Sequence, residues 1–376
     1  MTLTRGQFLA CLTAPLASQP AEELVDFADY GPDFRIDVQA SGPRVKVFDL
    51  RRLDTWLTPA GEFFTFHQTK TIDAIDVKNW HLDISGCVAR PRTVTFAELM
   101  QFPAKKLAAT IECSGNNGHP RLMNGLVSNG EWTGVELAPL LRECGVLPEA
   151  REVVFFGSDV ERERKWPIED RELEVPHARS IFVQDALDGT ALLALQLNGR
   201  ALSPEQGFPL RLILPGWYGM TQIKWINRIV VLDRRYEGRH MARNYHSIDT
   251  SGKVALETSI ARMRLKSVVA RVTRRQSDGR PAHTITGAAW GGRSPVERVQ
   301  VRIDDQPWRE AAIIEKGAPY AWSLWQAPWT GASAGEHRIV SRAVDSRGET
   351  QPVRSELLSA RENNSQWTRK IILPRL

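Results

Sequence analysis

Residues 108–118 read AATIECSGNNG. The first five have the compact apolar pattern of a short buried strand, and the remainder is a loop rich in glycine and asparagine, so Cys113 lies where the strand ends. The other cysteines, Cys11, Cys87 and Cys144, share no C-x-x-C spacing with it or with one another, which excludes zinc ribbons, thioredoxin-like redox pairs and c-type haem attachment. A lone cysteine in this position is either a small buried side chain or a single reactive thiolate.

Strand and helix patterns alternate on both sides of this segment up to about residue 250. Strands are predicted at residues 80–86 and 153–157 and within 207–216, and helices at 95–100 and 137–145. The stretch 159–174 is so rich in charge that it predicts a solvated loop. The first part of the chain is therefore expected to be mixed α and β.

The pattern changes after about residue 250. Helical periodicity fades, and short alternating runs separated by turn residues follow, as in a β-sandwich. This change places a domain boundary between residues 246 and 258. We expect an α+β fold with an N-terminal segment over 1–30, a mixed α/β domain over 31–250 and an all-β, Ig-like sandwich over 258–376.

Composition narrows the class of protein. With 376 residues, 42% hydrophobic and 25% charged, the chain is long enough for two globular cores. The formal charge of +5, from 49 basic and 44 acidic residues, is too small to argue for nucleic acid and is compatible with an anionic ligand. No run of about 18 apolar residues occurs, so no membrane span is expected.

The N-terminus resembles a weak export signal. A short apolar run follows a single arginine, Arg5, and ends in small residues near Ser18, where a twin-arginine signal would show two arginines. The alternative is an N-terminal helix docked on the domain. The expected location is therefore periplasmic or cytoplasmic.

Several blocks of the chain, in order, resemble the sulfite oxidase family. Residues 110–116 are similar to the family's cofactor-cysteine motif, and Gly130-Glu131-Trp132-Thr133-Gly134-Val135 to the segment that follows it. Further similarities lie at residues 206–211, 215–219 and 224–225 and, in the sandwich, at 287–290 and 296–299. The resemblance covers roughly residues 60–350 and implies a molybdopterin-binding oxidoreductase domain followed by a dimerisation domain.

The resemblance also implies a set of site residues. It makes Cys113 the molybdenum ligand, and a thiolate suits a redox-active metal whose other sulfur ligands come from a dithiolene cofactor. His119 and Arg121, just past Cys113, are candidates for substrate binding. The residues at the family's cofactor-contacting positions are His67, Gln68, Asp159, Gln206, Arg211, Gln222, Ile223 and Lys224.

For Arg211 and Lys224, the residue type and its expected burial also predict an anion nearby. Arg211 and Lys224 lie on or beside strands that should be buried, and a buried cation needs an anion. A pterin phosphate would supply one, and a salt bridge to a carboxylate of the chain is the alternative.

The chain departs from the family near the substrate. Sulfite oxidases usually follow the cysteine motif with arginine, where this chain has Asn116-Asn117-Gly118. Phe63-Phe64-Thr65-Phe66-His67 resembles a family segment that reads Phe-Val-Arg-x-His, so Thr65 stands in the arginine column. The family's catalytic tyrosine column holds His177. A histidine can donate a hydrogen bond or a proton near neutral pH, so His177 is the fourth candidate catalytic residue beside Cys113, His119 and Arg121.

The resemblance thus implies a molybdenum–molybdopterin oxidoreductase. It would transfer an oxygen atom on a small anionic sulfur compound such as sulfite, pass electrons to a separate carrier such as a cytochrome c, and form a homodimer. Trp290, Trp322, Trp325 and Trp329 are more large aromatic side chains than a small sandwich must bury, which also favours a dimer. The alternative is a cofactor-free Ig-like binding or scaffold protein with a degenerate catalytic domain. A nicotinamide or P-loop enzyme is disfavoured, because the chain lacks both glycine-rich motifs.

Overall fold

A computed structural model describes most of the chain. The described residues are 22–29, 37–38, 45–67, 72, 75–119, 122–165, 168–277, 280–292, 294–355, 357 and 361–375. Strands account for 48% of the described residues and helices for 10%, so this part of the protein is mostly β and the expected α+β class is not confirmed. The helix patterns in the sequence give only short helices, because few stretches keep an apolar face for more than two turns: α1 (Phe96–Leu99), α2 (Leu137–Cys144) and α3 (Val183–Leu187).

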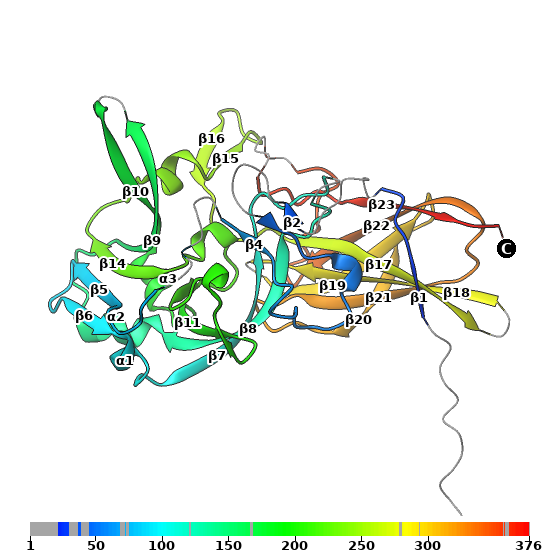
Figure 1. Cartoon of the computed structure of the whole chain (residues 1–376). Coiled ribbons are helices and arrows are strands. Elements are labelled where there is room, and N and C mark those ends of the chain that lie inside the picture. The colour runs from blue at the N-terminus through cyan, green and yellow to red at the C-terminus, as the bar shows by residue number, and fades with distance from the viewer. Residues whose placement is uncertain are drawn as a thin grey trace, which may run out of the picture.

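Two five-stranded sheets build the first part of the chain (Figure 1). The first has the order β10 (Ile168–Phe182), β9 (Glu152–Lys165), β14 (Ile226–Leu232), β5 (His81–Gly86), β6 (Arg92–Thr95). The second has the order β12 (Arg200–Ala201), β11 (Leu192–Leu197), β8 (Val127–Glu136), β7 (Ala104–Glu112), and β13 (Arg211–Ile213) also pairs with β11. Residues of both sheets share one core with α2, which ends at Gly145 in the left-handed conformation that favours glycine.

Short elements link the sheets. The 3-10 turns are η1 (Leu50–Arg52), η2 (Pro204–Gln206) and η3 (Gly219–Thr221), and η4 (Arg239–Arg243) is a π-helical turn. Two small sheets complete the set, one of β2 (Asp37–Val38), β3 (Val45–Lys46) and β4 (Thr65–Phe66), and one of β15 (His246–Asp249) and β16 (Leu256–Ser259).

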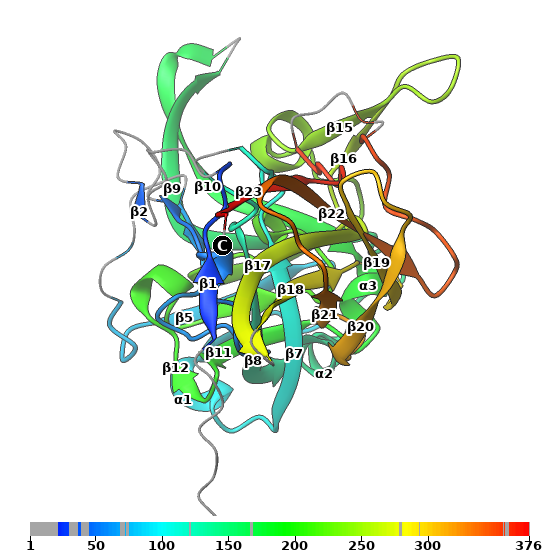
Figure 2. The same ribbon diagram turned by 90° about the vertical axis from the view of Figure 1, so that its right-hand side faces the viewer.

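An eight-stranded sheet forms the C-terminal part and lies beside the first two in Figure 1, with β1 along its edge in Figure 2. Its order is β1 (Glu23–Val25), β17 (Lys266–Ser277), β18 (Arg280–Trp290), β21 (Ser323–Trp329), β20 (Arg309–Glu315), β19 (Val296–Ile303), β22 (Gly335–Asp345), β23 (Thr368–Leu373). The sheet turns back on itself, because Val269 and Ile285 from one end share a core with Val299 and Ile339 from the other.

The tryptophans expected at a dimer interface are core residues. Trp290 is 1% exposed, Trp322 and Trp325 are fully buried, and Trp329 is 5% exposed. They pack inside the protomer, where large side chains fill the space between layers. The sequence argument from these tryptophans to a dimer was therefore wrong.

The charged stretch 159–174 was also misassigned, because it forms the outer part of the β9–β10 hairpin. This hairpin projects from the body of the protein in Figure 1. Arg162 pairs across it with Glu174 at 3.6 Å, and opposite charges on facing strand positions favour pairing. Where the structure describes these side chains, Arg162 and Glu174 are solvent-exposed, and charge alone does not distinguish a solvated strand pair from a loop.

The N-terminal prediction falls mostly outside the described residues, since 1–21 are not among them. Within the described part, β1 pairs antiparallel with β17 and so belongs to the C-terminal sheet. A search of the described helices finds none long and apolar enough to cross a membrane.

Candidate active site

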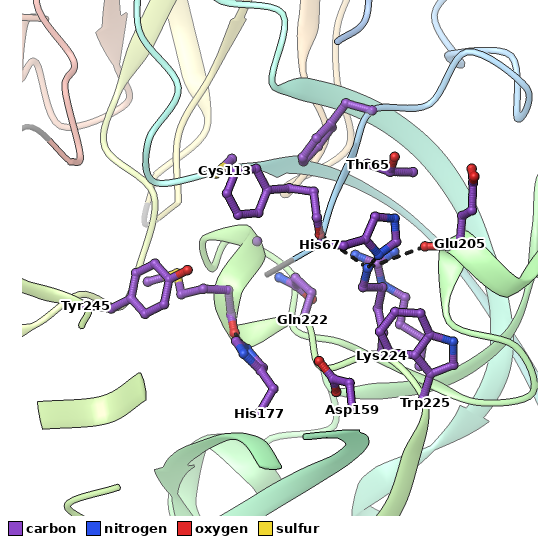
Figure 3. A pocket seen from close by; sticks show the side chains of 15 residues that line it. Thr65, His67, Cys113, Asp159, His177, Glu205, Gln222, Lys224, Trp225 and Tyr245 are labelled. Carbon is purple, nitrogen blue, oxygen red and sulfur yellow. Dashed lines mark hydrogen bonds between the residues drawn. The ribbon is translucent and has the colours of Figure 1, made fainter. Parts of the chain in front are cut away.

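A pocket collects polar side chains that are far apart in the sequence (Figure 3). It contains about 710 Å³ of space, part of it open to solvent, which is within the range of small-molecule and cofactor sites. Its lining residues are Phe64, Thr65, Phe66, His67, Cys113, Asp159, His177, Glu205, Arg211, Gly219, Met220, Gln222, Lys224, Trp225 and Tyr245.

Strand ends and turns place these side chains. Cys113 follows the last residue of β7, and its backbone N–H donates to the carbonyl of Leu126 at 2.9 Å. Asp159 and His177 come from the two strands of the β9–β10 hairpin, near its base. The pocket therefore lies where the ends of both sheets of the first part meet.

A buried arginine and a half-buried lysine lie near each other in the pocket. Arg211 is 8% exposed, its Nη1 donates to the carbonyl of Gln206 at 3.2 Å, and its guanidinium lies 5.2 Å from the ring of Trp132. Burial lowers the pKa of Arg211 to about 9. The pKa of Lys224 is also well below its ordinary value, first because of burial and then because of the nearby Arg211.

No carboxylate forms an ion pair with Arg211 or Lys224 among the described residues. Lys224 Nζ instead contacts His67 Nδ1 at 2.6 Å and the carbonyl of Phe66 at 3.3 Å, and Arg211 Nε is buried without a hydrogen-bond partner in this part of the chain. The two neighbouring cations repel each other, and the charges of Asp159 and Glu205 in the pocket act on Lys224 but are not among the causes that shift the pKa of Arg211, so a buried arginine without a carboxylate fits an anionic ligand.

Cys113 is suited to a metal that brings most of its own ligands. Burial raises the pKa of its thiol to about 11, with smaller effects from the Gly115 N–H, which lowers it, and from Glu112, which raises it. A thiol in this state ionises when a metal displaces its proton. Within the described residues no group of three or more His, Cys, Asp or Glu side chains could hold a metal ion.

His177 offers a hydrogen-bond acceptor to the pocket. Its Nε2 lies 3.1 Å from the carbonyl of Met220, and because a carbonyl can only accept, Nε2 carries the proton. Burial lowers the pKa of His177, so the imidazole is neutral at pH 7 and Nδ1 has an open lone pair. His177 thus donates its Nε2 proton to Met220 within the chain, and its role as a donor toward a substrate stays a prediction.

His240 packs on the inner side of His177, with ring centroids 4.3 Å apart. It is 1% exposed, and neither ring nitrogen has a hydrogen-bond partner in the described part of the chain. Burial, then the neighbouring His177 and Arg239, lower the pKa of His240 to about 3. His240 is therefore neutral over the physiological pH range, so it brings no positive charge into contact with the ring of His177.

The lowered pKa of His240 predicts that the free energy of unfolding decreases in acid. The folded state does not bind a proton on His240 until pH falls to about 3, whereas the unfolded chain binds one near pH 6.5. The stabilisation present above pH 6.5 is therefore lost as pH falls, by about 2 kcal/mol at pH 5. Urea unfolding at pH 7 and pH 5 should show this decrease in wild type and a smaller one in His240→Phe. An equal decrease in both proteins would contradict the shift.

Comparison with known proteins agrees with this geometry. Residues 68–240 match the oxidoreductase molybdopterin binding domain, and residues 257–373 match the Mo-co oxidoreductase dimerisation domain. The chain belongs to the sulfite oxidase family of molybdopterin-dependent oxidoreductases. The cofactor of this family member is molybdenum–molybdopterin.

Curated relatives and a solved structure cover most of the chain. The mitochondrial sulfite oxidase of Drosophila melanogaster is 29% identical over 335 residues, covering 81% of this chain and 56% of that protein. The sulfite oxidase of Gallus gallus is 28% identical, with 80% and 69% covered. The sulfane dehydrogenase SoxCD from Paracoccus pantotrophus superimposes with a TM-score of 0.75 at 25% identity, covering 100% of this chain and 96% of that one. This chain spans only about 56% of the Drosophila protein.

The pocket brings together most residues that the family resemblance selected. They are Cys113, His177, His67, Asp159, Arg211, Gln222 and Lys224. The side chain of Gln222 is already used, because Oε1 accepts from the Leu214 N–H at 2.6 Å and Nε2 donates to carbonyls of Leu214 and Trp217. Gln222 therefore shapes the turn that borders the pocket.

Other selected residues lie elsewhere. The side chain of Ile223 is 1% exposed in the hydrophobic core, and His119 is exposed and does not line the pocket. Gln206 does not line the pocket either. Its side-chain Nε2 donates to the carbonyl of Ala60, and its backbone carbonyl accepts from Arg211. Gln68 and Arg121 lie outside the described residues.

Sequence reasoning missed two residues near Cys113. Tyr245 lines the pocket from just before β15, and the guanidinium of Arg361 lies 4.4 Å from its ring centroid. Burial raises the pKa of Tyr245 to about 12, so its hydroxyl stays protonated, and Arg361 lowers the pKa of Cys113. No local motif marks either residue, because Tyr245 precedes the expected boundary and Arg361 lies in the far C-terminal part.

Proposed function

We propose that the protein is a molybdenum-cofactor oxidoreductase that catalyses oxygen-atom transfer on a small sulfur compound such as sulfite and passes electrons to a separate carrier, such as a cytochrome c. The observation that carries this proposal is the pocket lined by a lone cysteine, Cys113, and by two neighbouring cations, of which the buried Arg211 has no carboxylate partner among the described residues. When bound, the cofactor supplies a redox-active metal at which an oxygen atom is exchanged.

Residues of the chain would bind the cofactor and orient the substrate. Arg211 and Lys224 would bind the phosphate of the pterin, since Arg211 still has a buried donor to offer. Cys113 would hold the metal. On the substrate side, His177 Nδ1 accepts a hydrogen bond, and the protonated Tyr245 hydroxyl can donate one beside the positive charge of Arg361. This combination fits a small anion that also carries, or is accompanied by, a hydrogen-bond donor such as water.

Metal and pterin content test the proposal. Protein produced in a host that makes the cofactor should contain about one molybdenum and one pterin per chain, as measured by elemental analysis and by fluorescence of the oxidised pterin. Lys224→Met should lower both contents together, because the phosphate loses a cation while Cys113 is unchanged. Purified wild-type protein without molybdenum would favour the alternative, a cofactor-free binding protein.

We further propose that the C-terminal part is an Ig-like sandwich that forms a two-fold dimer. Support comes from the match of residues 257–373 to a dimerisation domain and from the sheet that encloses one core. Light scattering at micromolar concentration should give about twice the chain mass of 42.3 kDa. A mass of one chain under these conditions would refute the dimer.

A further inference from the structure

A buried ion pair lies directly beside the proposed metal ligand. Lys266 Nζ, at the start of β17, donates to Glu112 Oε1 at 2.9 Å and to the carbonyl of Asn116 at 3.2 Å. Both charged side chains are only 2% exposed. Glu112 is the residue before Cys113, and Asn116 lies in the loop after it, so a cation from the C-terminal sheet holds both sides of the cysteine.

The carboxylate of Glu112 is fully hydrogen-bonded. Trp290 Nε1, from β18, donates to Oε2 at 2.8 Å, and the side-chain amide of Asn116 donates to Oε1 at 3.0 Å. The other end of the Asn116 amide accepts from the Leu126 N–H at 3.0 Å. These bonds fix the loop from Glu112 to Asn116 in a single arrangement, because any shift would leave a buried charge unsatisfied.

Residues of the C-terminal part make further contacts with the same loop. The Glu362 N–H donates to the carbonyl of Ser114 at 2.7 Å. A Cβ on Gly118 would lie 2.0 Å from the ring of Trp367, so the loop and this ring approach as closely as glycine permits. The loop is thus held along its whole length by residues more than a hundred positions away in the sequence.

A buried ion pair is not by itself a strong source of stability, because desolvation offsets most of the attraction. The ion pair between Lys266 and Glu112 instead sets the charge beside Cys113 and the position of the loop. A carboxylate beside Cys113 opposes the negative charge of a thiolate, and Lys266 compensates that carboxylate while it anchors the loop.

We propose that Lys266 and Glu112 are positioning residues, through which the C-terminal part holds the Cys113 loop in its metal-binding arrangement and keeps the charge beside the thiolate balanced. The metal-binding role of Cys113 rests on the proposed function. The anchoring of the loop does not, since it concerns contacts within the chain. The cofactor site is therefore completed by the second part of the chain.

The test uses the full chain and the substitution Lys266→Met. Hydrogen exchange of the loop amides in cofactor-free protein should accelerate at least about tenfold, because the loop loses its anchor. In protein from a cofactor-competent host, molybdenum per chain should fall below about half of wild type. The midpoint potential of the remaining metal should become more negative, since the uncompensated Glu112 favours the more oxidised state.

Two other variants separate positioning from general destabilisation. Lys105→Met removes an ion pair to Glu136 from the other end of β7, where the side chains are partly exposed, and should leave loop exchange and potential unchanged. The double variant Glu112→Gln/Lys266→Met contains no charge in the pair, so its potential should return toward that of wild type while the loop still exchanges faster. It also remains informative if the single variant fails to fold, because no unpaired charge is left buried.

The outcomes are distinct. Wild-type protein without molybdenum would refute the proposed function, and the exchange measurement on that same protein would still decide whether Lys266 anchors the loop. Loop exchange in Lys266→Met equal to wild type would overturn the positioning role. Acceleration that is equal across β5 and the loop, with an unchanged potential, would also overturn it by showing only a global loss of stability.

Discussion

Cys113→Ser is expected to abolish turnover while the chain stays folded. The substitution replaces the strong sulfur donor with a hydroxyl that ligates a redox-active metal poorly, and the pterin would keep its proposed anchors at Arg211 and Lys224. The change in volume is small, so the free energy of unfolding should change by no more than about 1–3 kcal/mol, the cost of burying a hydroxyl. Activity and stability should therefore separate in this variant.

The measurement compares melting temperature, bound molybdenum and reduction of a one-electron acceptor on one preparation of Cys113→Ser. Cys144→Ser is the matched control, because Cys144 is fully buried in the hydrophobic core, away from the pocket. We expect the control to lose stability and to keep its activity in the folded fraction. Wild-type rates with sulfite or a sulfoxide in Cys113→Ser would remove this residue from the mechanism.

Arg211→Met is expected to act in opposite directions on the cofactor and on the apoprotein. The guanidinium is buried, has no carboxylate partner among the described residues and lies near Lys224. Without the cofactor this charge is a cost to the folded state, so its removal should stabilise the apoprotein by about 1–3 kcal/mol. The cofactor content should fall, because the phosphate loses its buried donor.

Urea unfolding of the apoprotein is the readout for Arg211. The free energy of unfolding at pH 7 should be lower in wild type than in Arg211→Met, because the guanidinium stays charged when it is buried. Arg228→Met, at an exposed position of β14, is the control and should change neither property. An apoprotein destabilised by Arg211→Met would show that the cation already has a stabilising partner.

Local sequence determined the placement of Cys113 and of the two cations, Arg211 and Lys224. Cys113 follows a strand because residues 108–112 have a strand pattern that ends in glycine and asparagine, and Arg211 and Lys224 border strands bounded by glycine and proline. Such features depend on neighbours within a few residues, so they can be read without the fold. The family resemblance, which rests on these same local motifs, added the molybdopterin cofactor.

Only the tertiary structure decided the roles of groups that depend on distant partners. His177 is an acceptor because the Met220 carbonyl holds its Nε2 proton, and Tyr245 and Arg361 reach the neighbourhood of Cys113 from the boundary region and from the C-terminal part. The burial of the four C-terminal tryptophans likewise depends on how the eight-stranded sheet turns back on itself. A local pattern fixes which face of a strand is apolar, but proton positions, pKa values and burial depend on groups that the fold brings together across hundreds of residues.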